Sequence, residues 1–256
     1  MFSRLFGSKK KDAAPEALAP EAADWSFLGT DMHSHLIPGI DDGAAATTDS
    51  LAMITRLKEM GYRQLITTPH IKSDHYRNNP KIILAGQKEL VENLKANSLD
   101  MPLKAAAEYY VDDVFMEMLE EGQLLTLQKN ELLIEFSFMF EPMNLPSTLF
   151  KIQTKGYKPV IAHPERYLYY HQRPEIYREF RDRGCLLQLN ALSLFGYYGR
   201  REKDMAEKLM AEGLYDYCGT DMHHIRHAEL LHMSGAQKAY QVLRTYPFRN
   251  NTIVLD

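Results

Sequence analysis

The feature that most constrains the fold of this chain is a regular alternation of short β-rich runs with amphipathic helical stretches after residue 24. We read seven such runs, and a helical stretch follows each of them. This alternation builds a parallel sheet covered by helices. No linker, repeat or low-complexity segment interrupts it, so we expect one barrel-like domain over residues 25–256.

Local signals place the elements within this alternation. Asn79 followed by Pro80 is a typical helix start, and Gly61 and Gly156 are typical helix ends. We expect strands over residues 27–33, 62–69, 103–110, 131–137, 158–163, 185–190 and 214–221. We expect helices near residues 48–60, 79–94, 113–120, 146–155, 174–183, 205–212 and 234–245.

Side chains with catalytic or metal-binding chemistry stand at the ends of these strands or just beyond them. Because the carboxyl ends of barrel strands face one rim, we expect such side chains to converge there. Each one alone has a structural alternative: a core histidine at His163, a buried acid paired with an arginine at Glu135, or a turn at Asp42-Gly43. Six strand ends of this kind are hard to explain by coincidence. They are His33 and His35 with Asp41 and Asp42, then His70, Glu108, Glu135, His163, and Asp221 with His223.

The residue types indicate a metal site. Imidazole nitrogens and carboxylate oxygens are the usual ligands of zinc, manganese and iron, and one carboxylate can bridge two ions. Two or three neighbouring ions can activate water and neutralise charge during displacement at phosphorus. The pattern therefore favours hydrolysis of a phosphate ester.

Charge and cysteine content exclude other classes of function. With 30 basic and 34 acidic side chains and a net charge of −4, the chain has no broad attraction to nucleic acid. Two cysteines in apolar stretches indicate a reducing compartment, and no run resembles a signal peptide or a membrane span, so we expect a cytoplasmic protein. We expect residues 1–24 to be a disordered tail, with weak contact to a membrane surface through its aromatic and lysine residues as the alternative.

Six segments carry a family resemblance: "DMHSHLIPGIDDG", "TTPH", "AAEYY", "LIEFS", "VIAHPER" and "GTDMH". From about Thr30 to the C-terminus the chain resembles the polymerase-and-histidinol-phosphatase (PHP) family. Within it, the chain looks like the bacterial protein-tyrosine phosphatases encoded with capsule and exopolysaccharide genes. The resemblance implies an α/β fold, a distorted, TIM-like (β/α)7 barrel, and three divalent ions, Mn, Fe or Zn with Mn favoured. The implied metal ligands are His33, His35, Asp42, His70, Glu108, Glu135, His163, Asp221 and His223.

The resemblance also implies how the site would act. A metal-bound hydroxide attacks phosphorus, and Arg166 binds the phosphate through paired guanidinium donors, although a surface salt bridge is the structural alternative. Arg226 is the candidate for a second phosphate-binding arginine, in a segment that departs from the family's spacing. No cysteine nucleophile is implied, since neither cysteine has an arginine six positions later. The implied substrate is a phosphotyrosine protein, a bacterial tyrosine kinase that regulates capsule or exopolysaccharide synthesis.

Several other functions stay open at this point. One is a PHP phosphatase of a small metabolite such as histidinol phosphate, or of nucleotides. An amidohydrolase also begins with His-x-His, but glutamates at the third and fourth strands and the closing Asp-x-His favour the PHP pattern. A non-catalytic regulator that only binds a kinase is the remaining alternative, and the complete ligand set disfavours it.

Overall fold

A computed structural model describes residues 22–255 of the chain. The tail expected over residues 1–24, with its proposed membrane contact, falls almost wholly on residues 1–21, outside the described part. At the start of that part, the N–H of buried Ala23 donates to His232 O at 2.7 Å. Between residues 22 and 255 we find no helix with the length and apolar character needed to cross a membrane.

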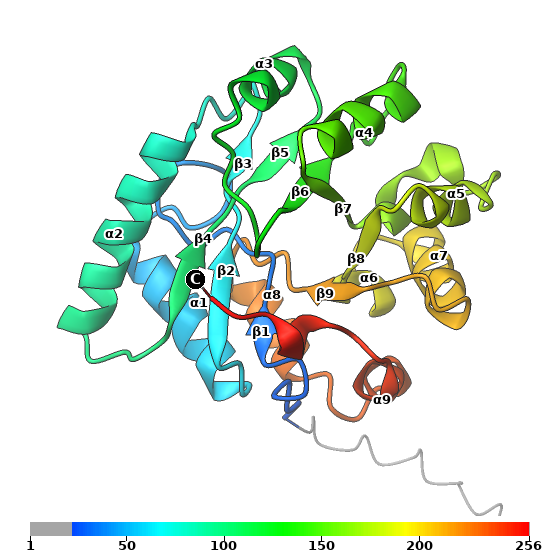
Figure 1. The fold of residues 1–256 in the computed structure, drawn as a ribbon. Helices are drawn as coiled ribbons and strands as arrows, with labels where there is room; N and C mark the ends of the chain where they lie inside the picture. The colour runs from blue at the N-terminus through cyan, green and yellow to red at the C-terminus, as the bar shows by residue number, and fades with distance from the viewer. Residues whose placement is uncertain (1–21, 256) are drawn as a thin grey trace, which may run out of the picture.

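The strands are all parallel and form two sheets, in the orders β1-β2-β4 and β3-β5-β6-β7-β8-β9. They occupy the middle of the molecule in Figure 1. Their bounds are β1 Thr30–Asp31, β2 Gln64–Thr67, β3 His70–Ile71, β4 Leu103–Ala105, β5 Glu108–Tyr110, β6 Glu131–Glu135, β7 Lys158–Ala162, β8 Leu186–Asn190 and β9 Tyr217–Gly219.

The two sheets continue into one another. The third expected strand is interrupted and divides into β4 and β5, and the second, observed as β2, is followed after two residues by the short strand β3, which was not predicted. Pro69 lies between β2 and β3, and because proline has no N–H it cannot donate to a strand ladder. Pairing nevertheless continues past the interruption, since Ala106 N donates to Thr67 O at 2.9 Å. A parallel bridge between Ser34 and Met222 also joins the segment after β1 to the segment after β9, so the sheet curls on itself.

Helices lie around this curled sheet, and Figure 1 shows α2, α3, α4, α5 and α7 on its periphery. The expected start at Asn79 is confirmed: its side chain accepts from Ile82 N, and Pro80 is the first helical residue. The helices are α1 Thr47–Glu59, α2 Pro80–Ala96, α3 Asp113–Glu121, α4 Leu145–Thr154, α5 Ile176–Asp182, α6 Ala191–Leu194, α7 Arg200–Ala211, α8 Ile225–His232 and α9 Lys238–Thr245, with 3-10 turns at Pro164–Arg166, Leu168–Tyr170 and Asn250–Thr252.

Helix α8 was not expected, because no element was predicted between residues 221 and 234. Its His224 N-cap makes no side-chain capping bond, so the sequence carries no start signal there. The helix is stabilised instead by packing of its buried face, which includes His227 and Leu231, and it lies against α1. Leu231 O also accepts from the Trp25 indole at 3.2 Å.

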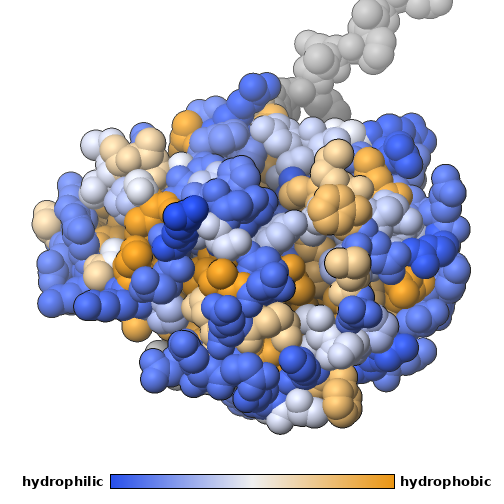
Figure 2. Space-filling model, turned by 90° about the horizontal axis from the view of Figure 1, so that it is seen from above, coloured by the Kyte–Doolittle hydropathy of each residue, from blue (hydrophilic) through white to orange (hydrophobic). Residues whose placement is uncertain are grey.

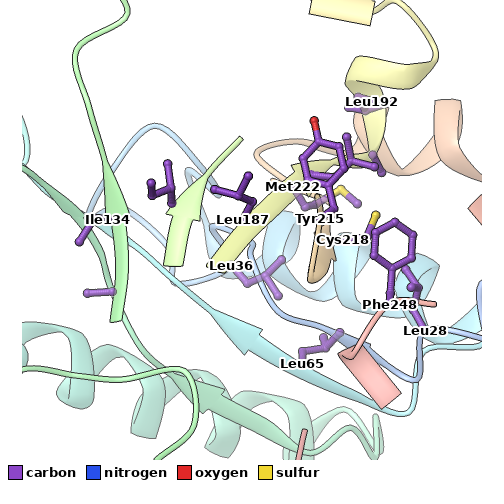
Figure 3. Close-up of a cluster of buried hydrophobic side chains, with 14 of the residues drawn as sticks. Leu28, Leu36, Leu65, Ile134, Leu187, Leu192, Tyr215, Cys218, Met222 and Phe248 are labelled. Carbon is purple, nitrogen blue, oxygen red and sulfur yellow. The ribbon is translucent and has the colours of Figure 1, made fainter. Parts of the chain in front are cut away.

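Alternate residues along the strands divide the core into two clusters, as the period of two in a β-strand requires. Ile134 and Leu187 belong to the larger cluster, where the strands meet the helices. Figure 3 shows part of this cluster. Their neighbours Leu133 and Leu186 belong to a smaller cluster that contains no helical residue and fills the inside of the curl. Outside, hydrophilic side chains surround scattered apolar groups on the face drawn in Figure 2.

Candidate metal centre and active site

The predicted metal ligands lie on the inner face of the curled sheet, at or just beyond the carboxyl ends of strands or, for His70 and Glu108, at the first residues of the short strands β3 and β5. Glu135 is two residues beyond Leu133 of the inner cluster, so both side chains point to the same side of β6. The same step leads from Ala106 to Glu108. The strand period and parallel pairing together bring these distant side chains to one place.

Three overlapping groups of ligand atoms result, each with its atoms within 4.8 Å of one another. His163 belongs to none of them, but its Nε2 lies 3.0 Å from Glu108 Oε1. The structure therefore brings all the predicted ligands together. The groups are His35, Asp42, His70 and His223; His33, His35, Glu108 and Asp221; and His70, Glu108 and Glu135.

The first two histidines present their Nε2 atoms to one space. The Nε2 atoms of His33 and His35 are 3.4 Å apart. That of His33 lies 3.2 Å from Glu108 Oε2 and 3.3 Å from Asp221 Oδ1, and that of His35 lies 3.5 and 3.4 Å from the same two atoms. Nitrogen lone pairs and carboxylate oxygens repel one another unless a proton or a cation lies between them. This donor set fits a divalent metal ion.

Two neighbouring side chains fix which nitrogen of each ring is free. Gln188 Oε1 lies 2.8 Å from His33 Nδ1, and since an amide oxygen only accepts, Nδ1 carries the hydrogen. Asp41 Oδ2 holds His35 Nδ1 in the same way at 2.8 Å. Such partners orient metal-binding histidines and set their tautomer. The role of Asp41, which the sequence left open, is therefore to orient His35.

Burial opposes the charged form of His33 and His35, but neighbouring carboxylates outweigh it and raise the pKa of both rings, so a metal ion bound there would displace protons. Burial disfavours the charged form of Glu108, but His33 and His70 outweigh it and hold the Glu108 pKa well below its usual range. For His70, burial outweighs the attraction of the Glu108 carboxylate and lowers the His70 pKa to about 4, so the ring is neutral at pH 7. An ionised carboxylate and a neutral imidazole are the forms that bind metals. Burial and the nearby Glu108 raise the pKa of Glu135, because two adjacent carboxylates repel when both are ionised.

Backbone geometry at two site residues is unusual. His163 and Asp221 have φ angles of 32° and 50°, in the left-handed region that side chains other than glycine seldom adopt. His163 directly follows β7, and Asp221 lies two residues after β9. Strained backbone of this kind clusters at functional sites, where surrounding contacts hold it in place.

Arg166 is held rigidly beside the carboxylates. Its guanidinium carbon lies 4.4 Å from the ring centre of Phe138 and 4.1 Å from that of Tyr198, and its Nη1 donates to Asp221 Oδ2 at 3.1 Å. Asn190 Nδ2 donates to the same oxygen at 2.8 Å. Burial opposes the Arg166 charge, but Asp221 outweighs it and raises the pKa. Ring contacts and the ion pair fix a charged, planar donor at the site.

A cavity of about 340 Å³ opens over these groups. Arg166, His223 and Asp42 line it, as do the aromatic residues Phe138 and Tyr197. Histidines and carboxylates together with an arginine and aromatic rings in the lining suit a phosphate group carried on an apolar moiety.

Arg226 does not join this cavity. It lies on the exposed side of α8 and is not among the cavity's lining residues. His224 and His227 do line it, and His227 is buried, not solvent-facing.

Gln188 and Asn190 were not predicted, because they are uncharged and lie on β8, which corresponds to the one expected strand without a predicted ligand. Strand periodicity contained the signal, because both follow Leu186 in steps of two and so share the inner face.

Comparisons with known proteins agree with this geometry. The chain is 29% identical over 197 residues to the tyrosine-protein phosphatase YwqE of Bacillus subtilis, covering 77% of this chain and 78% of that protein. It is 28% identical over 201 residues to the tyrosine-protein phosphatase CpsB of Streptococcus pneumoniae, covering 76% and 83%.

A solved structure is similar over 89% of this chain and 96% of its own, with a TM-score of 0.74 and 25% identity. It comes from the crystal structures of YwqE from Bacillus subtilis and CpsB from Streptococcus pneumoniae, described as metal-dependent tyrosine phosphatases. The family model described as "Capsular polysaccharide synthesis, CpsB/CapC" matches residues 29–241. This chain belongs to the CpsB/CapC family of capsular polysaccharide synthesis.

Proposed function

We propose that this protein is a metal-dependent protein-tyrosine phosphatase. The observation that carries the proposal is the convergence of histidines and carboxylates from different strand ends beside the fixed guanidinium of Arg166. Relatives named as tyrosine-protein phosphatases support it.

The ligand groups are proposed to hold three divalent ions, with Mn favoured over Fe and Zn. Three overlapping groups support that number, and their mixed nitrogen and oxygen donors suit each of these metals. Divalent ions held there would activate a water molecule as the nucleophile and neutralise negative charge on the phosphate. The proposed ligands are His33, His35, Asp42, His70, Glu108, Glu135, His163, Asp221 and His223.

Arg166 is proposed to bind two phosphate oxygens, because a planar guanidinium offers paired donors and its position is fixed before the substrate arrives. Its Asp221 contact occupies Nη1 and leaves other donors of the guanidinium for the substrate. We do not assign this role to Arg226, which is exposed outside the cavity.

The aromatic lining supports an aryl phosphate as substrate. Phe138 and Tyr197 offer ring faces or edges to a phosphotyrosine ring entering the cavity. Phenol ionises with a pKa of about 10, so its departure needs little help from a general acid.

The proposal also covers the fold of the domain, the protein substrate and the cellular compartment. The two sheets together with the Ser34–Met222 bridge are proposed to form a distorted (β/α)7 barrel, with residues 25–256 as the phosphatase domain. The proposed substrate is a bacterial tyrosine kinase that regulates capsule or exopolysaccharide synthesis. The proposed compartment is the cytoplasm, which suits the free thiols of Cys185 and Cys218.

The test compares hydrolysis of p-nitrophenyl phosphate, a phosphotyrosine peptide, a phosphoserine peptide and histidinol phosphate, with Mn²⁺ or with a chelator. We expect metal-dependent turnover that favours the phosphotyrosine peptide and collapses in His33→Ala. Preference for histidinol phosphate would reassign the substrate, and absence of turnover with every metal would contradict an enzymatic role.

A further inference from the structure

The loop between β6 and α4, residues 136–144, carries an unusual group of exposed apolar side chains. Met139 is 83% exposed, Phe140 67% and Met143 90%. We call these three residues the apolar tip. Side chains of this size normally gain by burial, so adjacent exposed ones mark a surface that binds something.

The tip is held outward by an anchored backbone. Phe136 N donates to the Tyr167 hydroxyl at 3.0 Å, and the Tyr169 hydroxyl donates to Ser137 O at 2.9 Å. Further along the loop, Glu141 forms an ion pair with Arg173. Because the loop is held at its start and at Glu141, the side chains of the apolar tip stay exposed to solvent.

The tip continues the wall of the candidate active site. Phe138 lines the cavity and packs on Arg166, and its ring centre lies 5.6 Å from that of His163. Met139 and Phe140 follow directly, so their Cα atoms lie within about 8 Å of the Phe138 Cα. An extended peptide advances about 3.3 Å per residue, so a chain with its phosphotyrosine in the cavity reaches the tip within a few residues.

We propose that the apolar tip binds large apolar side chains of the protein substrate that lie about two to four residues from its phosphotyrosine. This inference rests on the proposed phosphatase function and adds a determinant of substrate choice outside the cavity. Methionine suits the task because its flexible, polarisable side chain adapts to different partners.

The charge of the loop favours a peptide over a membrane. Glu141 is the only charged residue between positions 136 and 144, and it is negative. Binding to an anionic lipid surface relies on lysine and arginine, which this loop lacks.

The first experiment compares the double variant Met139→Ser/Phe140→Ser with Phe150→Ser. Phe150 is a matched control, because it is 65% exposed but lies on α4 rather than in the loop. Substrates are p-nitrophenyl phosphate and two phosphotyrosine peptides, one with leucines about two to four residues from the phosphotyrosine and one with serines at those positions. We expect the double variant to lose about tenfold in kcat/KM for the leucine peptide alone, which corresponds to about 1.4 kcal/mol. An equal loss on all three substrates, or the same loss in Phe150→Ser, would overturn the inference.

A binding measurement separates this inference from the proposed function. Fluorescence anisotropy with a fluorescein-labelled leucine peptide bearing a non-hydrolysable phosphonate in place of the phosphate needs no turnover. Weaker binding by the double variant supports the inference even if the wild type hydrolyses none of the substrates, an outcome that would contradict only the phosphatase proposal. Unchanged peptide binding by the double variant would overturn the inference. So would a double variant that keeps peptide binding and loses only self-association, measured by sedimentation, or only binding to phosphatidylglycerol vesicles.

Discussion

Replacing Gln188 with leucine tests whether this amide orients the metal-binding histidines. Leucine has nearly the same volume but accepts no hydrogen bond, so the buried donors His33 Nδ1–H and His163 N–H, at 2.8 and 3.3 Å from Gln188 Oε1, both lose their acceptor. A buried unsatisfied donor costs about 1–3 kcal/mol. If loss of the longer bond, from His163 N–H, costs about 1 kcal/mol and loss of the His33 bond costs about 1–3 kcal/mol, the free energy of unfolding should fall by about 2–4 kcal/mol.

Metal affinity should fall separately from stability. With its tautomer no longer fixed, His33 presents Nε2 to the carboxylates for only part of the time. Loss of such an orienting partner weakens metal binding by about 10- to 100-fold, or about 1.4–2.7 kcal/mol. The assay dialyses the protein against buffered Mn²⁺ at several concentrations and measures bound metal by mass spectrometry.

Gln64→Leu is the matched control. Gln64 Nε2 donates to Thr30 Oγ1 and to Ile253 O, each at 2.8 Å, and lies at the start of β2, outside the metal-ligand groups. We expect this variant to lose stability and to keep wild-type metal affinity. Wild-type metal binding by Gln188→Leu would refute the orienting role, and equal loss of metal in both variants would attribute the effect to general instability.

Three further predictions follow from the same geometry. Arg166→Lys keeps the positive charge but loses the planar guanidinium and its ring contacts. We expect kcat/KM for p-nitrophenyl phosphate to fall about 100-fold while the circular dichroism spectrum is unchanged. Near wild-type activity would contradict the phosphate-binding role. Gly219→Ala places a Cβ 2.6 Å from the His33 Cβ, so the free energy of unfolding in urea should fall by about 1–3 kcal/mol and the amount of bound metal should also fall. An unchanged urea midpoint would contradict this, because it would mean that the backbone accommodates the Cβ without cost. Burial raises the pKa of Cys185 to about 12 and holds that of Cys218 well above its usual value, so few thiolates exist at pH 7.5 and iodoacetamide should leave activity intact; stoichiometric inactivation would point to a cysteine mechanism.

Much of the site was predictable because strand ends carry a strong signal. Glu108 directly follows three alanines and Glu135 directly follows Leu-Leu-Ile, and a charged side chain in such an apolar stretch needs a compensating partner. Knowing that parallel strands share a rim was then enough to predict their convergence.

Other parts were not predictable from local patterns. Helix α8 has no capping signal and exists through packing against α1, so no helix was predicted around His224. Gln188 and Asn190 carry no charge and escaped notice, although both make hydrogen bonds to site residues. The exposed position of Arg226 depends on the direction in which α8 starts, which the sequence does not reveal.

By itself, the sequence determined the alternation of seven β-rich runs with amphipathic helices and the ligand types near the strand ends, because period and composition are local properties. Only the tertiary structure decided that His33 and Glu108, 75 residues apart, lie 3.2 Å from each other. It also decided that two rings and Asp221 fix Arg166 beside them. Such distances follow from how the sheet curls and which helices cover it, a free-energy balance over the whole chain that no single segment encodes.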